Sequence, residues 1–265
     1  MNSLKEKLEQ RIPVFGTFNT LSHTSITNLI SSSGLDFQIL DLEHGALNFS
    51  TVADHVNACK SSKSTLNHTC SLLVRDSVVS RYSILQCLDQ GSDGLVIPHV
   101  KSIKDISRLI DYIYYPPLGQ RSFSPYTNAG SFGIIPPQTF AQTQAQDHFL
   151  VIIIESEDGI CNLPSILECH SAHIDAVYFG AYDLSADMGY IGNPKHPNVH
   201  TKIMRALDIC NKYNVAAGAY VPKTFSEAQD LVGLGFKFIA YQVDSNILAS
   251  SYLEFMKSVQ SNYRL

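Results

Sequence analysis

The sequence predicts a single α/β domain over residues 1–265, folded as a (β/α)8 TIM barrel with parallel strands inside a ring of helices. Short apolar, β-branched segments recur eight times along the chain, and segments with helical periodicity separate most of them. The chain has 265 residues, a length that suits eight such units in one closed barrel. An open, doubly wound sheet is the alternative, but no Gly-x-Gly-x-x-Gly motif follows an early strand.

The predicted strands are short runs of β-branched and large apolar residues, which favour extended backbone. The fifth run contains Leu150–Ile154 and the sixth contains Ala176–Gly180. In chain order, the predicted strands are 14–18, 37–41, 70–75, 94–98, 150–155, 175–179, 215–220 and 237–241.

The predicted helices lie between these strands. In the first of them Thr24 can cap the helix, while Ile26 and Ile30 belong to its apolar stripe. Gly34 and Gly91 stand where a helix should end, because glycine adopts the left-handed backbone of a helix C-terminus without strain. In chain order, the predicted helices are 24–33, 50–60, 77–89, 102–113, 200–213, 224–233 and 245–258.

One irregular region, residues 114–147, interrupts this alternation. It contains five prolines and three glycines, so it predicts a long loop after the fourth unit. Loops of this length inside compact domains are usually functional.

The composition excludes several classes of protein. The net charge is −5 and no stretch is densely basic, so a nucleic-acid partner is not expected. No segment approaches 18 uninterrupted apolar residues, and residues 1–11 lack the apolar run of a signal peptide, so we expect a cytoplasmic protein with no membrane span. The six cysteines are scattered and are interpreted as reduced thiols.

Polar and charged side chains stand where the predicted strands end. Asp41–Gly45 follows the second strand, Arg75 ends the third, His99 follows the fourth, Glu155 ends the fifth and Asp183 follows the sixth. The carboxyl ends of all barrel strands meet at one face, where barrel active sites lie. We therefore expect these side chains in one mouth.

Glu155 and Asp183 are 28 residues apart, one strand–helix–strand repeat. Two acidic side chains at equivalent strand ends form a natural seat for a hard divalent cation. Two structural alternatives remain open: Glu155 could pair with a neighbouring arginine, and Asp183 could cap the following helix.

The other polar residues have competing interpretations. Arg75 ends an apolar run, so its charge needs an anionic partner. His44 by itself is typical of a structural histidine, but beside Asp41, which can orient its ring, it becomes a candidate acid–base residue. His99 is interpreted as a structural or rim residue, and Asp89 as a charge that solvates a helix end.

Short blocks of sequence carry a further signal: Gly34–Phe37, Asp41–His44, Leu73–Arg75, Leu88–Gly91, Val96–Pro98, Tyr115–Arg121, Ile154–Glu155, Gly159–Ile160, Phe179–Ser185, Met188–Gly189 and His196–Pro197. In this order, over nearly the full chain, they resemble the HpcH/HpaI aldolase family. Its members are metal-dependent class II pyruvate aldolases related to the citrate lyase β-subunit. Any one block would be weak evidence, but together they are specific.

The resemblance implies a role for each polar residue. Glu155 and Asp183 would hold a divalent cation, Mg²⁺ first and Mn²⁺ or Co²⁺ as alternatives. His44, oriented by Asp41, would be the acid–base residue and would act through water. Arg75 would contact the keto oxygen of a 2-oxo acid substrate and stabilise its enolate.

The resemblance also implies a substrate lining and an assembly. Phe18, Ala181 and Tyr182 would line the substrate site, and Asp89 would lie near a site across a subunit contact. The implied assembly is a homohexamer, a trimer of dimers in which the last helix, 245–258, is exchanged between subunits.

Three residues depart from the family's pattern close to the site. Tyr182 follows Gly180-Ala181 where the family often has Gly-Pro before a small residue, Ile153 stands where glutamine is common, and Gln242 replaces a usual glycine. These departures leave the substrate open more than the metal.

Three functions follow as hypotheses. The first is reversible cleavage of a 4-hydroxy-2-oxo acid to pyruvate and an aldehyde. The second is condensation of oxaloacetate with acetyl-CoA to citrate, and the third is a non-catalytic barrel that binds a keto acid. A Schiff-base aldolase is disfavoured, because Lys101 and Lys237 are not well placed at strand ends.

Overall fold

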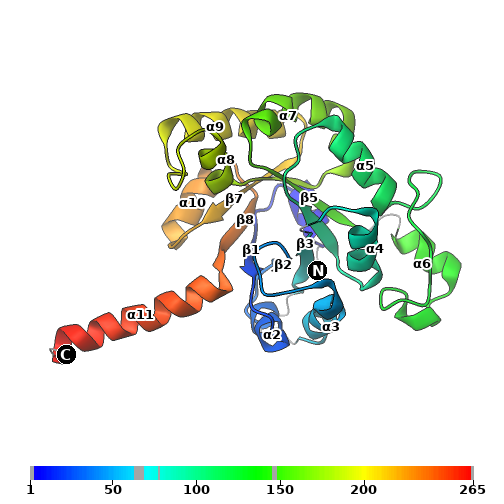
Figure 1. The fold of residues 1–265 in the computed structure, drawn as a ribbon, viewed down its shortest axis with the longest axis horizontal. Helices are drawn as coiled ribbons and strands as arrows, with labels where there is room; N and C mark the ends of the chain where they lie inside the picture. The colour runs from blue at the N-terminus through cyan, green and yellow to red at the C-terminus, as the bar shows by residue number, and fades with distance from the viewer. Residues whose placement is uncertain (1–2, 63–68, 77, 145–147, 264–265) are drawn as a thin grey trace.

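A closed barrel of parallel strands forms the centre of the molecule. The computed structural model describes residues 3–62, 69–76, 78–144 and 148–263. Its eight strands follow one another around the barrel in chain order, and β8 pairs with β1 to close it. Helices surround most of the barrel (Figure 1). The predicted (β/α)8 barrel is confirmed.

The strands are β1 Val14–Asn19, β2 Phe37–Asp41, β3 Ser71–Arg75, β4 Gly94–Ile97, β5 Phe149–Ile154, β6 Ala176–Phe179, β7 Ala216–Val221 and β8 Phe238–Val243. The α-helices are α1 Leu4–Glu9, α2 Thr24–Ser32, α3 Val52–Ser61, α4 Arg81–Asp89, α5 Ile103–Ile113, α6 Pro137–Gln144, α7 Glu157–His170, α8 Ala181–Asp187, α9 Pro197–Lys212, α10 Phe225–Leu234 and α11 Asp244–Tyr263. Three short 3₁₀ helices are η1 Phe49–Thr51, η2 Ser131–Gly133 and η3 Ser171–His173.

The predicted elements are present, and every strand boundary lies within two residues of its prediction. The predicted helix 77–89 begins later, at Arg81, because Ser80 caps it; residue 77 lies outside the described residues. The predicted helix 245–258 is longer than expected and reaches Tyr263.

Four helices were not predicted. α7 contains Pro164 in its interior, which masks its periodicity, although Ser156 caps its start through the backbone N–H of Gly159. α6 lies inside the segment expected to be a loop, so that prediction is wrong over Pro137–Gln144; residues 145–147 lie outside the described residues. α1 and α8 are short and lie outside the strand–helix repeat.

Large aromatic side chains fill the amino-terminal half of the barrel. The rings of Phe37 and Phe238 stack with their centroids 4.0 Å apart, and Phe149 stacks on Phe238 at 5.9 Å. A Cβ atom at Gly16 would lie 2.3 Å from the Phe37 ring, so only glycine fits beside it. Leu8 of α1 joins this cluster. The barrel is therefore packed at this end, and a ligand would enter from the carboxyl ends of the strands.

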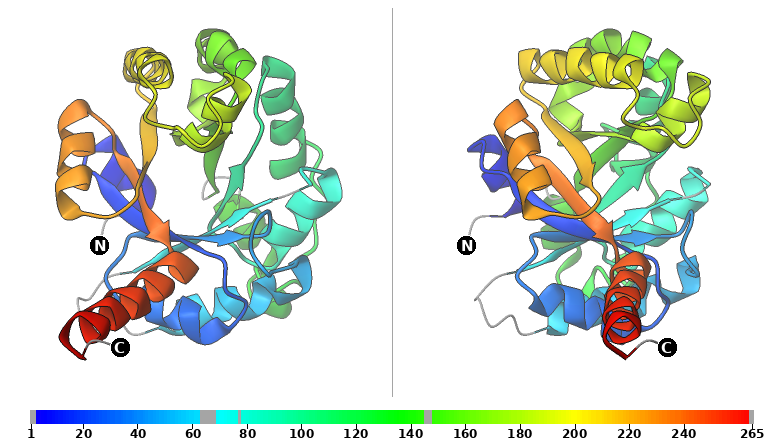
Figure 2. Two further views of the ribbon diagram at one scale, coloured as in Figure 1. Left: turned by 60° about the vertical axis from the view of Figure 1, so that its left-hand side comes forward. Right: turned by 90° about the vertical axis from the view of Figure 1, so that its left-hand side faces the viewer.

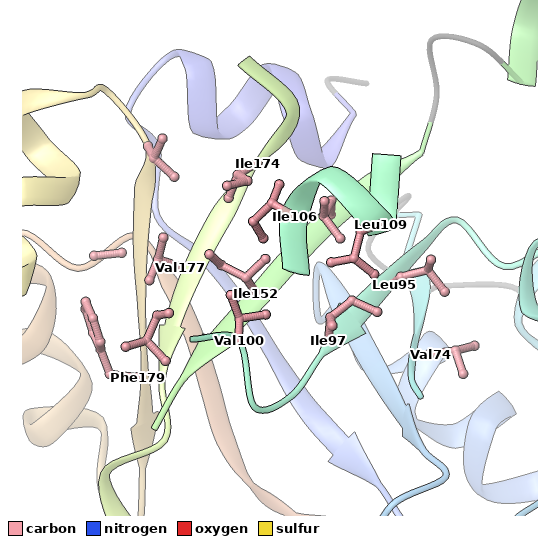
Figure 3. Packing of buried hydrophobic residues seen from close by; sticks show 14 of the residues in the cluster. Val74, Leu95, Ile97, Val100, Ile106, Leu109, Ile152, Ile174, Val177 and Phe179 are labelled. Atoms are coloured by element: carbon pink, nitrogen blue, oxygen red, sulfur yellow. The ribbon is translucent and has the colours of Figure 1, made fainter. Parts of the chain in front are cut away.

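A second cluster packs the outer faces of the strands against the helices. Figure 3 shows part of it, where Ile106 and Leu109 of α5 meet Ile97, Ile152 and Val177 of neighbouring strands. Burial of these side chains holds the helices in place and so positions the loops that follow each strand.

Helix α11 leaves the barrel and projects away from it (Figures 1 and 2). Asp244 is its one buried residue, and its carboxylate accepts hydrogen bonds from the backbone N–H groups of Thr20 and Leu21. Further along, Tyr252, Leu253 and Phe255 are exposed. No described helix has the length and apolar character to cross a membrane.

Candidate active site

A cavity of about 890 Å³ opens at the carboxyl ends of the strands. It is lined by most of the residues that the sequence predicted for the site: Phe18, Asp41, His44, Arg75, Glu155, Ala181, Tyr182 and Asp183. These come from β1, β2, β3, β5 and the segment after β6. The fold thus brings together side chains that are far apart in the sequence.

Glu155 is the buried carboxylate of the cavity, with 6% of its surface exposed. Its Oε1 atom accepts a hydrogen bond of 2.7 Å from the backbone N–H of His99. Burial raises the pKa of Glu155, the hydrogen bond and charge of His99 lower it, and the charges of Asp183 and Glu43 raise it further. The pKa of Glu155 therefore lies above its ordinary value, which means that the surrounding protein does not fully stabilise the negative charge of its carboxylate.

Asp183 lies in the first turn of α8 and is exposed at the cavity. Gly180, the residue between β6 and α8, lets this segment approach Glu155 closely. A Cβ atom at position 180 would lie 2.7 Å from both Cβ and Oε2 of Glu155. The glycine therefore keeps the space that the Glu155 carboxylate occupies.

Arg75 is held by two carboxylates. Its Nε and Nη2 atoms donate to the two oxygens of Asp41 at 2.8 and 2.5 Å, and its Nη1 atom lies 3.2 Å from Glu43 Oε2. Burial works against the charge of Arg75, but the hydrogen bond and charge of Asp41, together with Glu43, outweigh it and raise the pKa of Arg75. The arginine is a permanently charged, fixed group in the cavity.

The expected orientation of the His44 ring by Asp41 is not what the structure shows. Asp41 binds Arg75 through its side chain and accepts hydrogen bonds from the backbone N–H groups of Glu43 and His44. The ring of His44 instead has its Nε2 atom 4.0 Å from Glu43 Oε2, and its side chain is 68% exposed. Asp41 therefore orients the loop that carries His44, because Arg75 on the adjacent strand takes up its carboxylate.

His99 and Glu43 are functional candidates that the sequence interpretation missed. The ring of His99 bridges two carboxylates, with Nδ1 2.7 Å from Glu155 Oε1 and Nε2 3.0 Å from Glu43 Oε1. His99 has a φ of 59°, a left-handed conformation that is unusual for a non-glycine residue. The sequence indicated only that His99 follows a strand. The contacts of its ring with Glu155 and Glu43 depend on the fold and could not be predicted from the sequence.

Aromatic residues form the floor of the cavity. The Arg75 guanidinium lies 5.0 Å from the centroid of the Phe18 ring, and Tyr178 meets Phe18 edge-on at 6.0 Å. Tyr178 was not predicted as a site residue. Its hydroxyl has no hydrogen-bond partner among the described residues, and burial raises its pKa. A protonated phenol therefore faces the cavity beside Arg75 and Glu155.

Comparisons with known proteins identify the family of this chain. The family model of the HpcH/HpaI aldolase/citrate lyase family matches residues 15–251. The chain belongs to this family. It is 32% identical over 250 residues to the 4-hydroxy-2-oxo-heptane-1,7-dioate aldolase of Escherichia coli, covering 94% of this chain and 91% of that protein. The predicted family and the predicted enzyme class, a carbon–carbon lyase, are confirmed.

Solved structures share the fold. The HpcH/HpaI aldolase from Desulfitobacterium hafniense DCB-2 has a TM-score of 0.87 and 27% sequence identity, covering 98% of this chain and 97% of that one. The citrate synthase SbnG has a TM-score of 0.85 at 21% identity, covering 99% of both chains, which is a likeness of fold alone.

Asp89 lies away from the cavity of its own chain. Asp89 ends α4, near the start of β4, so it belongs to the opposite end of its own barrel from the cavity. Its carboxylate accepts a hydrogen bond of 2.7 Å from Arg121. A substrate contact within the same chain is therefore excluded for Asp89, and any such contact would be to a neighbouring chain.

The departures from the family's pattern also have structural counterparts. Ile153 and Tyr182 line the cavity, and the Tyr182 side chain is largely exposed. Gln242 has a φ of 50°, a conformation that glycine adopts without strain. Lys195 is the single lysine among the described residues that line the cavity, and its Nζ atom lies 3.5 Å from Glu227 Oε1.

The carboxylates of this cavity fit a hard cation. No described set of three or more histidine, cysteine, aspartate or glutamate side chains is arranged to hold a metal. Mg²⁺ is commonly bound by one or two carboxylates, with water and substrate oxygens completing its coordination. Glu155 and Asp183 match that pattern, and a bound cation would offset the burial and the charge repulsion that raise the pKa of Glu155.

Proposed function

We propose that this protein is a metal-dependent aldolase that reversibly cleaves 4-hydroxy-2-oxo acids to pyruvate and an aldehyde. The observation that supports this most directly is the placement of Glu155, Asp183 and Arg75 on one cavity. The cavity therefore combines a seat for a cation with a fixed positive charge. A 2-oxo acid carries the oxygens that both groups bind.

Glu155 and Asp183 would hold the divalent cation, with Mg²⁺ as the first candidate and Mn²⁺ or Co²⁺ as alternatives. When bound, the cation supplies a Lewis acid that lowers the cost of forming an enolate from the 2-oxo acid. His99 holds the Glu155 carboxylate in place through its backbone N–H. We propose that His99 acts as a positioning residue for this ligand.

Arg75 would stabilise negative charge on the keto oxygen. Its guanidinium is already oriented by Asp41 and Glu43, so little reorganisation is needed as charge develops. In the condensation direction, pyruvate loses a proton from its methyl group and its C3 atom bonds to the aldehyde carbon. The aldehyde oxygen then takes up a proton, and cleavage reverses these steps.

His44 would exchange protons with the 4-hydroxyl group of the substrate. Its ring lies at the cavity, its side chain is 68% exposed, and its Nε2 atom is 4.0 Å from Glu43 Oε2. A water molecule can therefore connect the imidazole to the substrate, as general acid–base catalysis permits. The Tyr178 hydroxyl would donate a hydrogen bond to a substrate oxygen beside Arg75.

The proposal is tested with Glu155→Gln, which removes the charge but keeps the shape. Pyruvate release from a 4-hydroxy-2-oxo acid is followed by coupling to lactate dehydrogenase, and Mn²⁺ binding is measured by calorimetry. We expect both to be lost while the circular dichroism spectrum is unchanged. Glu168→Gln is the control, because Glu168 is exposed on α7 away from the cavity. Unchanged metal-dependent turnover in Glu155→Gln would refute the proposal.

Assays of the unmodified protein distinguish the aldolase from the two other hypotheses. Formation of citrate from oxaloacetate that requires acetyl-CoA, with no aldehyde released, would favour the citrate synthase. Binding of metal and oxalate with no turnover of any oxo acid would favour a keto-acid-binding protein.

We also propose that the chain assembles as a homohexamer through α11. Tyr252, Leu253 and Phe255 are exposed on this projecting helix, and apolar side chains in such a position favour burial against another chain. Light scattering of the full chain should give a hexamer, and Leu253→Glu should reduce its mass. A monomer in the unmodified protein would contradict this.

A further inference from the structure

We infer that the outer part of the active-site cavity binds an extended apolar chain on the aldehyde portion of the substrate. This inference rests on the proposed aldolase function and names the class of aldehyde that the enzyme takes. The cavity volume of about 890 Å³ lies near the upper end for small-molecule sites. Pyruvate would occupy only a fraction of it.

The cavity has two chemically different zones. The inner zone contains Asp41, Arg75, Glu155 and Asp183, where the oxo acid would bind. The outer zone lies towards α9, β7 and α10. Most of its side chains are aliphatic or aromatic (Ile203, Met204, Ala219, Leu231, Leu234 and Phe236), and Lys195 and His200 also line this side of the cavity.

The outer zone exists because β7 carries small side chains. Ala217 and Ala219 belong to the cluster on the outer face of the barrel, where they would meet the helices. Neither fills the space that a valine or leucine would fill. The apolar lining therefore encloses usable space in continuity with the polar zone.

The charges of the cavity disfavour a second carboxylate in the outer zone. Arg75 is already matched by Asp41 and Glu43, and Lys195 lies beside Glu227. His200 is the other basic side chain near this zone. A carboxylate among the apolar residues would lose hydration without a dedicated partner, whereas a hydrocarbon chain would gain from burial. The outer zone thus selects an uncharged, apolar aldehyde.

A chain-length series tests this with the full-length protein. Condensation of pyruvate is measured with acetaldehyde, butanal, hexanal and octanal, and with succinic semialdehyde as an acceptor with a terminal carboxylate. We expect kcat/KM to rise by roughly two- to fourfold per methylene group, as the burial of each one predicts. Octanal should be preferred to succinic semialdehyde.

One substitution examines the zone directly. Leu234 is about half-exposed at the edge of the cavity, so Leu234→Lys is compatible with folding. It should lower kcat/KM for octanal at least fivefold and raise it for succinic semialdehyde. Leu29→Lys, on the exposed face of α2, is the matched control and should alter none of these ratios.

The outcomes separate this inference from the proposed function. Turnover of acetaldehyde without dependence on chain length, or a preference for succinic semialdehyde, overturns the inference alone. Absence of turnover with every acceptor overturns the proposed aldolase function and this inference with it.

Discussion

Substitution of Gly180 by alanine should weaken the metal site without requiring a left-handed backbone at position 180. The φ and ψ angles of Gly180 are −76° and 78°, so an alanine does not need a left-handed conformation. Its Cβ atom, however, would lie 2.7 Å from Cβ and Oε2 of Glu155 and 3.2 Å from Ile153 Cγ2. An ordinary contact begins at 3.4 Å, so Glu155 and position 180 must separate by about 0.7 Å, the difference between 3.4 and 2.7 Å. Because one of the close atoms is the Cβ of Glu155, the backbone beside it must move together with the carboxylate.

The magnitude follows from what holds Glu155. A shift of this size changes the hydrogen bond of 2.7 Å from the N–H of His99 to the Glu155 carboxylate, and with it the placement of this carboxylate relative to Asp183. Loss of support around a metal ligand typically costs about 10- to 100-fold in metal affinity. Misplacement of a catalytic group by ~1 Å can cost ~10² in rate. We therefore expect Mn²⁺ affinity to fall by about 10- to 100-fold and kcat/KM by about 100-fold at limiting metal.

The assay combines calorimetric titration with Mn²⁺, turnover as a function of metal concentration, and thermal unfolding. Overpacking of this kind costs about 1–3 kcal/mol, so the variant should still be folded at 25 °C. Gly233→Ala is the matched control, because a Cβ atom there has no neighbour within 4 Å. Metal affinity and turnover of Gly180→Ala within twofold of the unmodified protein would refute the assignment of Glu155 as a ligand.

Three further predictions concern other parts of the molecule. Tyr178→Phe keeps the ring between Phe18 and Phe238 but removes the unpartnered hydroxyl, so kcat/KM should fall by about 10- to 100-fold; an activity equal to that of the parent would exclude the hydroxyl as a substrate contact. Asp41→Asn removes the charge that fixes Arg75, so we expect weaker inhibition by oxalate and a loss of about 3–5 kcal/mol in unfolding free energy. The inhibition constant of oxalate and urea titrations measure these two effects. Unchanged oxalate binding would contradict the role of Asp41 in fixing Arg75. Burial, reinforced by the charge of Arg121, lowers the pKa of His148 to about 3. The unfolded chain binds a proton at this histidine below about pH 6.5, whereas the folded protein does not until near pH 3. The contribution of His148 to stability is therefore fully present above about pH 6.5 and falls by about 1.4 kcal/mol per pH unit as the pH drops towards 3. Urea titrations at pH 7 and pH 5.5 should show this loss in the parent and a smaller one in His148→Gln, and an equal loss in both would exclude His148 as its source.

Much of the barrel could be predicted from local patterns. Strand β5 is a run of six buried apolar residues, and such a run, bounded by polar residues, specifies a strand covered on both faces. Helix α7 escaped prediction because Pro164 breaks its pattern, yet packing of Leu163, Ile166 and Leu167 in the core retains the helix. Tertiary contacts thus override a local propensity where enough apolar surface is buried.

The site could be predicted as a set of residues but not as a set of contacts. Placement at strand ends identified Arg75, Glu155 and Asp183, because parallel strands deliver their carboxyl ends to one face. The pairing of Asp41 with Arg75, and of Glu155 with His99, depends on which side chains of adjacent strands reach each other. The positive φ of His99 could not be predicted from the sequence, because histidine rarely adopts this conformation.

By itself, the amino-acid sequence determined the alternation of strands and helices, the closed barrel and the acidic and basic groups at its mouth. These follow from periodicity along the chain, which is a local property. Only the tertiary structure decided which charges neutralise each other, how far the cavity extends beside β7, and that α11 leaves the barrel. Those features depend on distances between atoms that are remote in sequence, and such distances are set when the core is packed.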